Sequence, residues 1–313
     1  MTLHRAVIVG ASHAGAQLAA SLRQEGWDGE IVLVGNESAA PYQRPPLSKA
    51  YLAGNCTVDK LAIRSAEFYT KLRIEVLDAT VEAIDRAAGH LSLSTGEVLP
   101  YDRLALCTGA RPRRLSTPGA DLAGVFYLRT AADVEMIRDA TRPGRRAVII
   151  GGGYIGLETA ASLRALGLEV TVLEATERVL ERVTAPEVSA FFDRIHREAG
   201  VNIQTGARVE ALSGDGKVGE VVLAGGESIS ADLVIVGIGV EPNTELAAAA
   251  GLVVDNGVVI GLAGLGIGGF GVNYAADPAN PILMPRPNGF GSVYSNFQLM
   301  KISPAIAWKA GEK

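Results

Sequence analysis

The stretch RAVIIGGGYIGLETAASLRALGLEVTVLE, residues 146–174, decides the fold of this chain. An apolar run over residues 147–150 leads into a glycine cluster. The GxGxxG spacing in this cluster is made by Gly151, Gly153 and Gly156. Glycines at this spacing permit a tight turn, a close approach of the backbone to a pyrophosphate and close packing of helix on strand. The cluster therefore predicts a dinucleotide-binding turn.

The residues after the glycines complete this unit. A helical pattern ends at Gly167, and a second apolar run follows over residues 170–173. The apolar face of the predicted helix consists of Leu157, Ala160, Ala161 and Leu163. Glu174 follows the second strand, 18 residues past Gly156, about where an acid hydrogen-bonds a ribose diol. The phosphates are expected at the positive N-terminal end of the helix.

Residues 6–37 repeat the unit. The run VIVGASHAGAQLAASL aligns without gaps with VIIGGGYIGLETAASL, and two copies in one chain predict two nucleotide sites. In the first copy Ser12 replaces the middle glycine, and we expect it to be tolerated because it is small and its hydroxyl can bond a phosphate. The acid of this copy, Glu37, comes one residue late, so Asn36 is expected to share the ribose contact.

Composition excludes several classes of function. The net charge is −5, from 29 basic and 34 acidic residues, and no basic tail is present, which argues against a nucleic-acid partner. The first strand pattern begins within a few residues of Met1, which leaves no room for a signal peptide and predicts a cytoplasmic location. Cys56 and Cys107 form no CxxC motif, and no histidine has metal-ligand spacing, so no metal site is predicted. Of the four histidines only His13 lies where chemistry is expected, and the other three are expected at the surface.

The segment between the two copies is expected to be a loop followed by strands. Residues 41–54, PYQRPPLSKAYLAG, contain two adjacent prolines, which fit neither a helix interior nor a sheet interior. A short helix is expected to begin at residues 47–52. From the residues alone, Lys49 is expected to be a solvated surface lysine. Residues 74–98 alternate in hydrophobicity and predict antiparallel strands around a Thr95-Gly96 turn.

The same order of elements occurs twice, because a strand-rich stretch is followed each time by a buried strand. The buried strand lies within residues 101–112 in the first copy and within residues 231–243 in the second. The chain is therefore predicted to be an α/β protein with two Rossmann-like three-layer dinucleotide-binding domains, each carrying a β-meander insertion. The predicted divisions are 1–112, 113–244, a return segment at 245–260 and an atypical tail at 261–313.

The two glycine motifs, PPLSKAYLAG and RVLERVTAP (residues 178–186) together resemble the FAD-dependent ferredoxin reductases of Rieske oxygenase and bacterial cytochrome P450 systems. These enzymes have the pyridine nucleotide-disulfide oxidoreductase type of fold. The resemblance covers residues 4–260 almost without gaps. It implies FAD in the first domain and NAD(H) in the second, with the nicotinamide against the flavin.

By position, the resemblance implies two sets of cofactor-binding residues. The FAD set is Gly10, Ser12, His13, Ala14, Gly15, Asn36, Glu37, Arg44, Lys49, Val81, Thr108, Gly109 and Arg129. The NADH set is Gly151, Gly153, Ile155, Gly156, Glu158, Glu174 and Gly237. Lys49 is implied to lie beside flavin N5 and to pair with Glu158, which replaces the surface interpretation and makes these two the catalytic residues. Glu174 is implied to favour NADH, because its carboxylate would repel the 2′-phosphate of NADPH.

The activity implied by the resemblance is hydride transfer from NADH to the flavin, followed by single-electron transfers to a small [2Fe-2S] ferredoxin or to rubredoxin. No protein nucleophile is needed, because the cofactor carries the chemistry. The lack of a cysteine pair argues against a disulfide reductase. Two alternatives stay open: a truncated or chimeric fragment that binds NAD(H) but holds FAD weakly and does not turn over, and an NADH oxidase or apoptosis-inducing-factor-like flavoprotein.

The resemblance ends after Ile260. Residues 261–313 contain few charged residues and many glycines, and the expected flavin-binding aspartate motif is echoed only faintly at residues 274–277. The tail resembles a fragment of a FadL-type outer-membrane protein, but it is too rich in glycine for a membrane helix. No membrane contact is expected for residues 1–260. We expect a truncated reductase joined to unrelated sequence.

Overall fold

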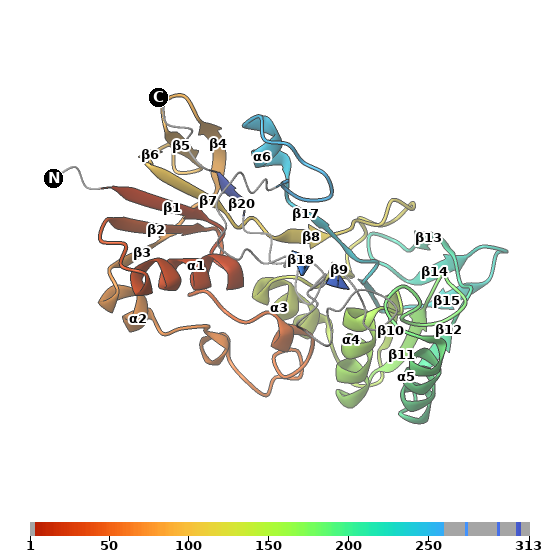
Figure 1. The fold of residues 1–313 in the computed structure, drawn as a ribbon. Helices are drawn as coiled ribbons and strands as arrows, with labels where there is room; N and C mark the ends of the chain where they lie inside the picture. The colour runs from red at the N-terminus through yellow and green to blue at the C-terminus, as the bar shows by residue number, and fades with distance from the viewer. Residues whose placement is uncertain (1–3, 260–272, 275–292, 295–304, 308–313) are drawn as a thin grey trace, which may run out of the picture.

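The computed structural model describes residues 4–259, 273–274, 293–294 and 305–307. Two α/β units lie side by side, one red to orange and the other green to teal (Figure 1). The antiparallel strands β8 (Ala110–Pro112) and β17 (Val240–Pro242) run between them.

The first unit is built on a sheet with the strand order β20-β7-β1-β2-β3. All neighbours in this sheet are parallel except β20, which pairs antiparallel with β7. The strands are β1 (Arg5–Val9), β2 (Glu30–Gly35), β3 (Ile74–Asp78), β7 (Arg103–Leu106) and β20 (Ala305–Ala307). The helices of this unit are α1 (His13–Gln24) and α2 (Ala66–Lys71).

The central strand β1 is buried on both faces, as its continuous apolar run requires. Val7 and Val9 pack with Leu91 of the antiparallel meander β4 (Val81–Asp85), β5 (His90–Leu93) and β6 (Val98–Pro100). Ile8 points to the other face and packs with Ala16 of α1. The sheet is therefore the middle layer of three, with α1 and the meander on opposite sides (Figure 1).

The second unit repeats this plan with the strand order β12-β11-β10-β16-β9, all neighbours parallel. Its strands are β9 (Val125–Tyr127), β10 (Arg146–Ile150), β11 (Glu169–Leu173), β12 (Asn202–Gln204) and β16 (Leu233–Val236). Its helices are α3 (Ala131–Ala140), α4 (Tyr154–Ala165) and α5 (Pro186–Glu198).

The second sheet is also covered on both faces. Ile149 packs with Leu157 and Leu163 of α4, whereas Val148 packs with Val221 of the second meander. That meander consists of β13 (Val209–Ser213), β14 (Glu220–Leu223) and β15 (Ser228–Ser230). Each of the two similar runs of sequence thus forms a three-layer unit with a meander insertion. The predicted fold class, an α/β protein with two Rossmann-like units, is confirmed.

Three local predictions are wrong. Residues 74–78 form β3, which pairs in parallel with β2 instead of joining an antiparallel meander, because the buried Ile74 and the partly buried Leu77 pair with the apolar residues of β2. Ala161 of α4 is exposed and lies off the apolar face. His196 is buried, with 8% of its surface exposed, because it lies on the inner side of the amphipathic helix α5 and stacks on Phe192.

The remaining segments connect the units. The loop after β2 contains the 3₁₀ helices η1 (Pro45–Ser48) and η2 (Val58–Leu61), and η1 contacts α4. Helix α6 (Glu245–Ala249) turns back to the first unit, where Leu246 and Ala247 pack with Leu91. The domain boundaries stay predictions. Strands β18 (Asn273–Tyr274) and β19 (Val293–Tyr294) pair with each other, whereas most of the predicted tail lies outside the described residues.

Candidate functional site

The first glycine turn joins β1 to α1 and has no room for side chains at two positions. Gly10 has φ +113°, and a Cβ there would lie 2.0 Å from the carbonyl oxygen of Cys107. A Cβ on Gly15 would lie 2.0 Å from the carbonyl oxygen of Gly10. Ser12 is the N-cap residue of α1, but its hydroxyl does not cap the helix and instead accepts a hydrogen bond of 3.2 Å from Nε of Arg44. The phosphate contact expected of Ser12 stays a prediction.

The second glycine turn, between β10 and α4, has the same construction. Gly151 has φ +112°, and a Cβ on Gly156 would lie 2.0 Å from the carbonyl oxygen of Gly151. The middle glycine, Gly153, differs from these two, because a Cβ there would meet nothing within 4 Å. Open space at the middle position is what the approach of a pyrophosphate requires. Gly237 lies beside this turn, since its carbonyl oxygen is the atom that a Cβ on Gly151 would meet, at 2.5 Å.

The helices after the two glycine turns begin without side-chain caps. Neither the N-cap residue of α1 nor that of α4 makes a side-chain cap, and neither helix has an acid in its first turn. Helix α3, in contrast, begins with a complete capping box between Thr130 and Asp133. Uncapped first-turn N–H groups lack an intrahelical partner and bind anions well. Both turns therefore fit the diphosphate of a dinucleotide.

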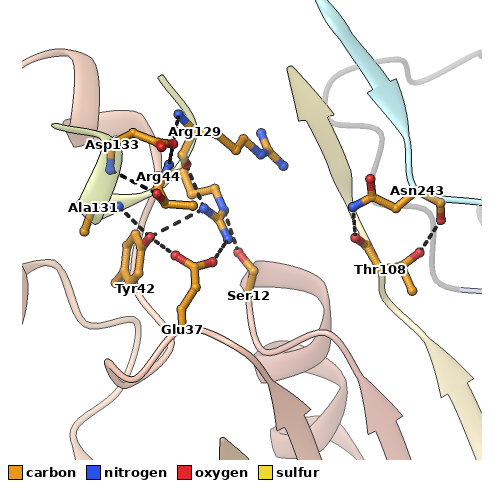
Figure 2. Close-up of polar contacts among 10 residues, drawn as sticks. Ser12, Glu37, Tyr42, Arg44, Thr108, Arg129, Ala131, Asp133 and Asn243 are labelled. Atoms are coloured by element: carbon orange, nitrogen blue, oxygen red, sulfur yellow. Dashed lines mark hydrogen bonds and ion pairs between the residues drawn. The ribbon is translucent and has the colours of Figure 1, made fainter. Parts of the chain in front are cut away.

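A cavity of about 490 Å³ opens beside the first glycine turn. It brings together Gly10, Asn36, Val81 and Thr108, four residues of the predicted FAD set that lie far apart in the sequence. Asn243 and Thr108, which both line this cavity, form two hydrogen bonds with each other (Figure 2). Nδ2 of Asn243 donates to the carbonyl oxygen of Thr108 at 2.7 Å, and the Thr108 hydroxyl donates to the carbonyl oxygen of Asn243 at 2.7 Å.

Glu37, the predicted ribose ligand, is held by two neighbours. Its carboxylate accepts hydrogen bonds from the Tyr42 hydroxyl and from the Arg44 guanidinium (Figure 2). Arg44 also donates to the carbonyl oxygen of Arg129 at 2.7 Å, and the Tyr42 hydroxyl accepts from the backbone N–H of Ala131 at 2.9 Å. Burial and the bond to Glu37 raise the pKa of Tyr42 to about 12. The end of β2 is thereby connected to the start of α3 in the second unit.

Three basic side chains gather near the start of α1. Burial, together with the charge of Arg44, lowers the pKa of Arg129, and burial together with both arginines lowers the pKa of His13. The Arg129 guanidinium points away from Glu37 (Figure 2) and makes no hydrogen bond to any of the described residues. Two guanidiniums and an imidazole crowded at a phosphate-type turn fit a doubly charged diphosphate, whose charge would relieve their mutual repulsion. Gly109, with φ +66°, lies beside Arg129, while Ala14, in the first turn of α1, is partly buried against the core.

Lys49 and Glu158 meet across the two units. The Lys49 ammonium lies 2.6 Å from Oε2 of Glu158 on α4, and their side chains are 49% and 33% exposed. Lys49 follows η1, so the proline loop of the first unit carries it to the nucleotide-binding helix of the second. The contact that the resemblance implies is present: Lys49 is exposed, as the residues alone suggested, but its ammonium is paired with Glu158.

Glu174 lies at the end of β11, as predicted, and its carboxylate contacts the second glycine turn. It accepts from the backbone N–H of Gly152 at 2.7 Å and from the N–H and hydroxyl of Thr176 at 2.9 Å each. Ile155 is 41% exposed near the start of α4. The predicted residues therefore form three groups: the first turn with its cavity and arginines, the Lys49–Glu158 pair, and the second turn with Glu174.

A family model described as pyridine nucleotide-disulphide oxidoreductase matches residues 4–261. The chain belongs to this family. Over 261 residues, 81% of the chain, it is 50% identical to putidaredoxin reductase CamA of Pseudomonas putida, and it is 45% identical to rhodocoxin reductase of Rhodococcus erythropolis. It is also similar to the crystal structure of a covalent putidaredoxin reductase–putidaredoxin complex, with a TM-score of 0.79 and 48% identity over 82% of the chain.

The chain spans only part of these proteins: 62% of putidaredoxin reductase CamA, 60% of rhodocoxin reductase and 63% of the chain in the solved complex. The matched part contains both glycine turns and the Lys49–Glu158 pair.

This family member has no cysteine pair of the kind that reduces disulfides. Cys56 and Cys107 are both free thiols. Burial raises the pKa of Cys107 to about 11, so its thiolate is scarce at neutral pH. Within the described ranges no cluster of His, Cys, Asp and Glu is suited to a metal ion, and no helix is long and apolar enough to span a bilayer.

Sequence reasoning missed Tyr42, Ser48 and Asn243. Tyr42 and Ser48 lie in the PYQRPPLSK run beside Arg44 and Lys49, and this proximity was the available signal. Asn243 follows a Pro at the end of β17, and its partner Thr108 is far away in the sequence. These two residues lie close together only because β8 pairs with β17.

Proposed function

We propose that this protein is an FAD-dependent oxidoreductase that passes electrons from NADH to a small [2Fe-2S] ferredoxin or to rubredoxin. The observation that carries the proposal is the Lys49–Glu158 ion pair, which joins the loop after the first glycine turn to the helix of the second. Two nucleotide turns alone would suit two independent sites, whereas a cation held between them suits one shared reaction centre. The names of putidaredoxin reductase and rhodocoxin reductase support a small redox protein as acceptor.

When bound, FAD supplies the ring that accepts a hydride and releases electrons singly. The residues of this chain position it. The first-turn N–H groups of α1, with Arg44 and Arg129, bind the diphosphate, and the cavity lined by Asn36 and Val81 takes the adenosine. Lys49 would hold a positive charge near the bound ring and would stabilise negative charge that develops there, and Glu158 holds the Lys49 ammonium at 2.6 Å.

NADH is assigned to the second turn. The open space at Gly153 admits its pyrophosphate, and the uncapped start of α4 binds the phosphate charge. The Glu174 carboxylate, already fixed by Gly152 and Thr176, accepts the ribose hydroxyls and repels a 2′-phosphate. A cytoplasmic location accompanies this proposal, because NADH is supplied there, and cell fractionation tests it.

The test uses the full chain, purified and incubated with FAD. We expect a yellow protein whose visible flavin absorbance is bleached by NADH without oxygen and restored by an oxidised [2Fe-2S] ferredoxin or rubredoxin. A protein that stays colourless but binds NADH would contradict the proposal and favour a fragment that binds nucleotide without turnover. A protein that is bleached by NADH and reoxidised only by oxygen would favour an NADH oxidase.

A further inference from the structure

Ser48 lies between Lys49 and the helix that holds Glu158. It is the last residue of η1, and only 4% of its surface is exposed. Its hydroxyl donates a hydrogen bond of 2.6 Å to Oε2 of Glu158. This is the same oxygen that lies 2.6 Å from the Lys49 ammonium. Oε2 of Glu158 therefore accepts a hydrogen bond from a buried hydroxyl and forms an ion pair with a half-exposed ammonium.

A second hydrogen bond fixes the backbone of Ser48 to the same helix. The hydroxyl of Ser162 donates to the carbonyl oxygen of Ser48 at 2.7 Å. Ser162 follows Glu158 by one helical turn of α4, so the two side chains share a face of the helix. The Ser48 backbone is thus held by Ser162, while the Ser48 side chain acts only on Glu158. The two bonds can be removed separately.

The Glu158 carboxylate needs such a support. Its side chain is 33% exposed and that of Lys49 is 49% exposed, and an ion pair with this much access to water is weak and poorly oriented by itself. A hydrogen bond from a buried hydroxyl fixes the direction of the carboxylate, because Ser48 has little freedom to move. The ammonium then has one preferred position rather than several.

We propose that Ser48 is a positioning residue for the reaction: its hydroxyl orients Glu158, and Glu158 in turn holds the Lys49 ammonium at the flavin. This inference rests on the proposed function for the reaction, but its first link, from Ser48 to Lys49, is a property of the protein without cofactor. A loss of the Ser48 hydroxyl is therefore expected to affect both the free protein and the reaction.

The first experiment uses the full chain without cofactor. Lysines are labelled with an acylating reagent, and the labelling rate of Lys49 is compared with that of the exposed Lys60 by peptide mass spectrometry. An ammonium held against a carboxylate reacts slowly, so Ser48→Ala is expected to raise the Lys49 rate several-fold, toward that in Glu158→Gln. Ser65→Ala, which removes an exposed serine hydroxyl at the start of α2, is the control and is expected to leave the ratio unchanged. An unchanged ratio in Ser48→Ala overturns the proposal.

The second experiment follows flavin bleaching by saturating NADH in the FAD-loaded chain. Ser48→Ala is expected to slow bleaching roughly tenfold, the usual effect of losing a hydrogen bond to a charged group. Ser48→Thr, which keeps the hydroxyl, is expected to recover most of the rate. Ser65→Ala is expected to stay within roughly twofold of the unmodified chain.

A double-substitution cycle separates positioning from mere packing. If Ser48 acts through Glu158, Ser48→Ala adds no further slowing in a Glu158→Gln background. Equal slowing in both backgrounds, or slowing by Ser65→Ala as large as that by Ser48→Ala, overturns the proposal. If the unmodified FAD-loaded chain is not bleached by NADH, the proposed function fails, and the labelling of Lys49 still decides whether Ser48 orients Glu158.

Discussion

Lys49 and Glu158 form an ion pair of 2.6 Å although they belong to different α/β units. Lys49 follows a proline loop that leaves the first sheet, and Glu158 lies on the helix that follows the second glycine turn. The pair therefore lies at the contact between the two units, and its charge is also proposed to serve the reaction.

Replacement of Lys49 by Met is expected to slow flavin bleaching by NADH roughly a hundredfold, since one preorganised positive group is lost at the site where negative charge develops. Stopped-flow absorbance of the FAD-loaded chain measures the rate. Lys60→Met, a matched change at an exposed lysine of the same loop, is expected to have no effect. Equal rates in the unmodified chain and Lys49→Met would remove Lys49 from the mechanism.

Alanine at Gly153 and alanine at Gly156 are expected to act differently. The added Cβ meets nothing at Gly153, where φ is −79°, so the melting temperature should hold while the dissociation constant for NADH rises roughly tenfold. At Gly156 the added Cβ would lie 2.0 Å from a backbone oxygen, and the free energy of unfolding should fall by about 1–3 kcal/mol. Calorimetry measures both quantities. Unchanged NADH affinity in Gly153→Ala would argue against a pyrophosphate at this turn.

Glutamine at Glu174 is expected to weaken the preference for NADH over NADPH. The substitution removes the charge that repels a 2′-phosphate while it keeps the size of the side chain, and the ratio of kcat/KM for the two nucleotides should fall roughly tenfold. Glu177→Gln changes an exposed acid three residues away and is expected to leave the ratio as it was. If both variants shift the ratio equally, general charge and not a ribose contact determines the preference.

Asp232 is expected to stabilise the fold in a pH-dependent way. Hydrogen bonds from the Arg146 side chain and backbone lower its pKa to about 2 from a usual value of 3.8. A carboxyl whose pKa falls on folding stabilises the folded state above its unfolded pKa, and this contribution is lost as the pH falls from about 4 to about 2. Because the pair is partly exposed, Asp232→Asn should cost about 1 kcal/mol at pH 7.

The cost of Asp232→Asn should shrink toward zero near pH 2, and urea denaturation at both pH values measures it. Asp215→Asn, at an exposed loop aspartate, serves as the control. A cost that is the same at pH 7 and at low pH would show that the carboxylate charge is not the source of the stabilisation.

The fold was largely predictable from local patterns. Glycines at 10, 15, 151 and 156 sit where a Cβ has no room, so their spacing in the sequence reports the turn directly. The antiparallel pairing predicted for residues 74–78 was wrong, because a short alternating strand can join either a meander or the edge of a parallel sheet. The surface position predicted for His196 was wrong, because a single polar residue that is buried on a helix face cannot be recognised from the amino-acid composition.

The candidate site was only partly predictable. Residues named by a motif, such as Gly153 or Glu174, could be placed because the motif itself specifies their surroundings. The contacts of Tyr42 with Ala131, of Ser48 with Glu158 and of Asn243 with Thr108 could not be placed, because the two partners are distant in the sequence. No pattern along the chain records which hydroxyl reaches which carboxylate.

The sequence by itself determined two phosphate-type turns, their three-layer setting and the acid that ends the second unit, because each of these depends on contacts within a few tens of residues. Only the tertiary structure decided that the proline loop of the first unit touches α4 of the second. That contact places Lys49 on Glu158, with Ser48 behind it. Its physical reason is packing: Leu47 and Leu52 are buried in the same core as Leu157 and Leu163, which brings the polar groups between them within bonding distance.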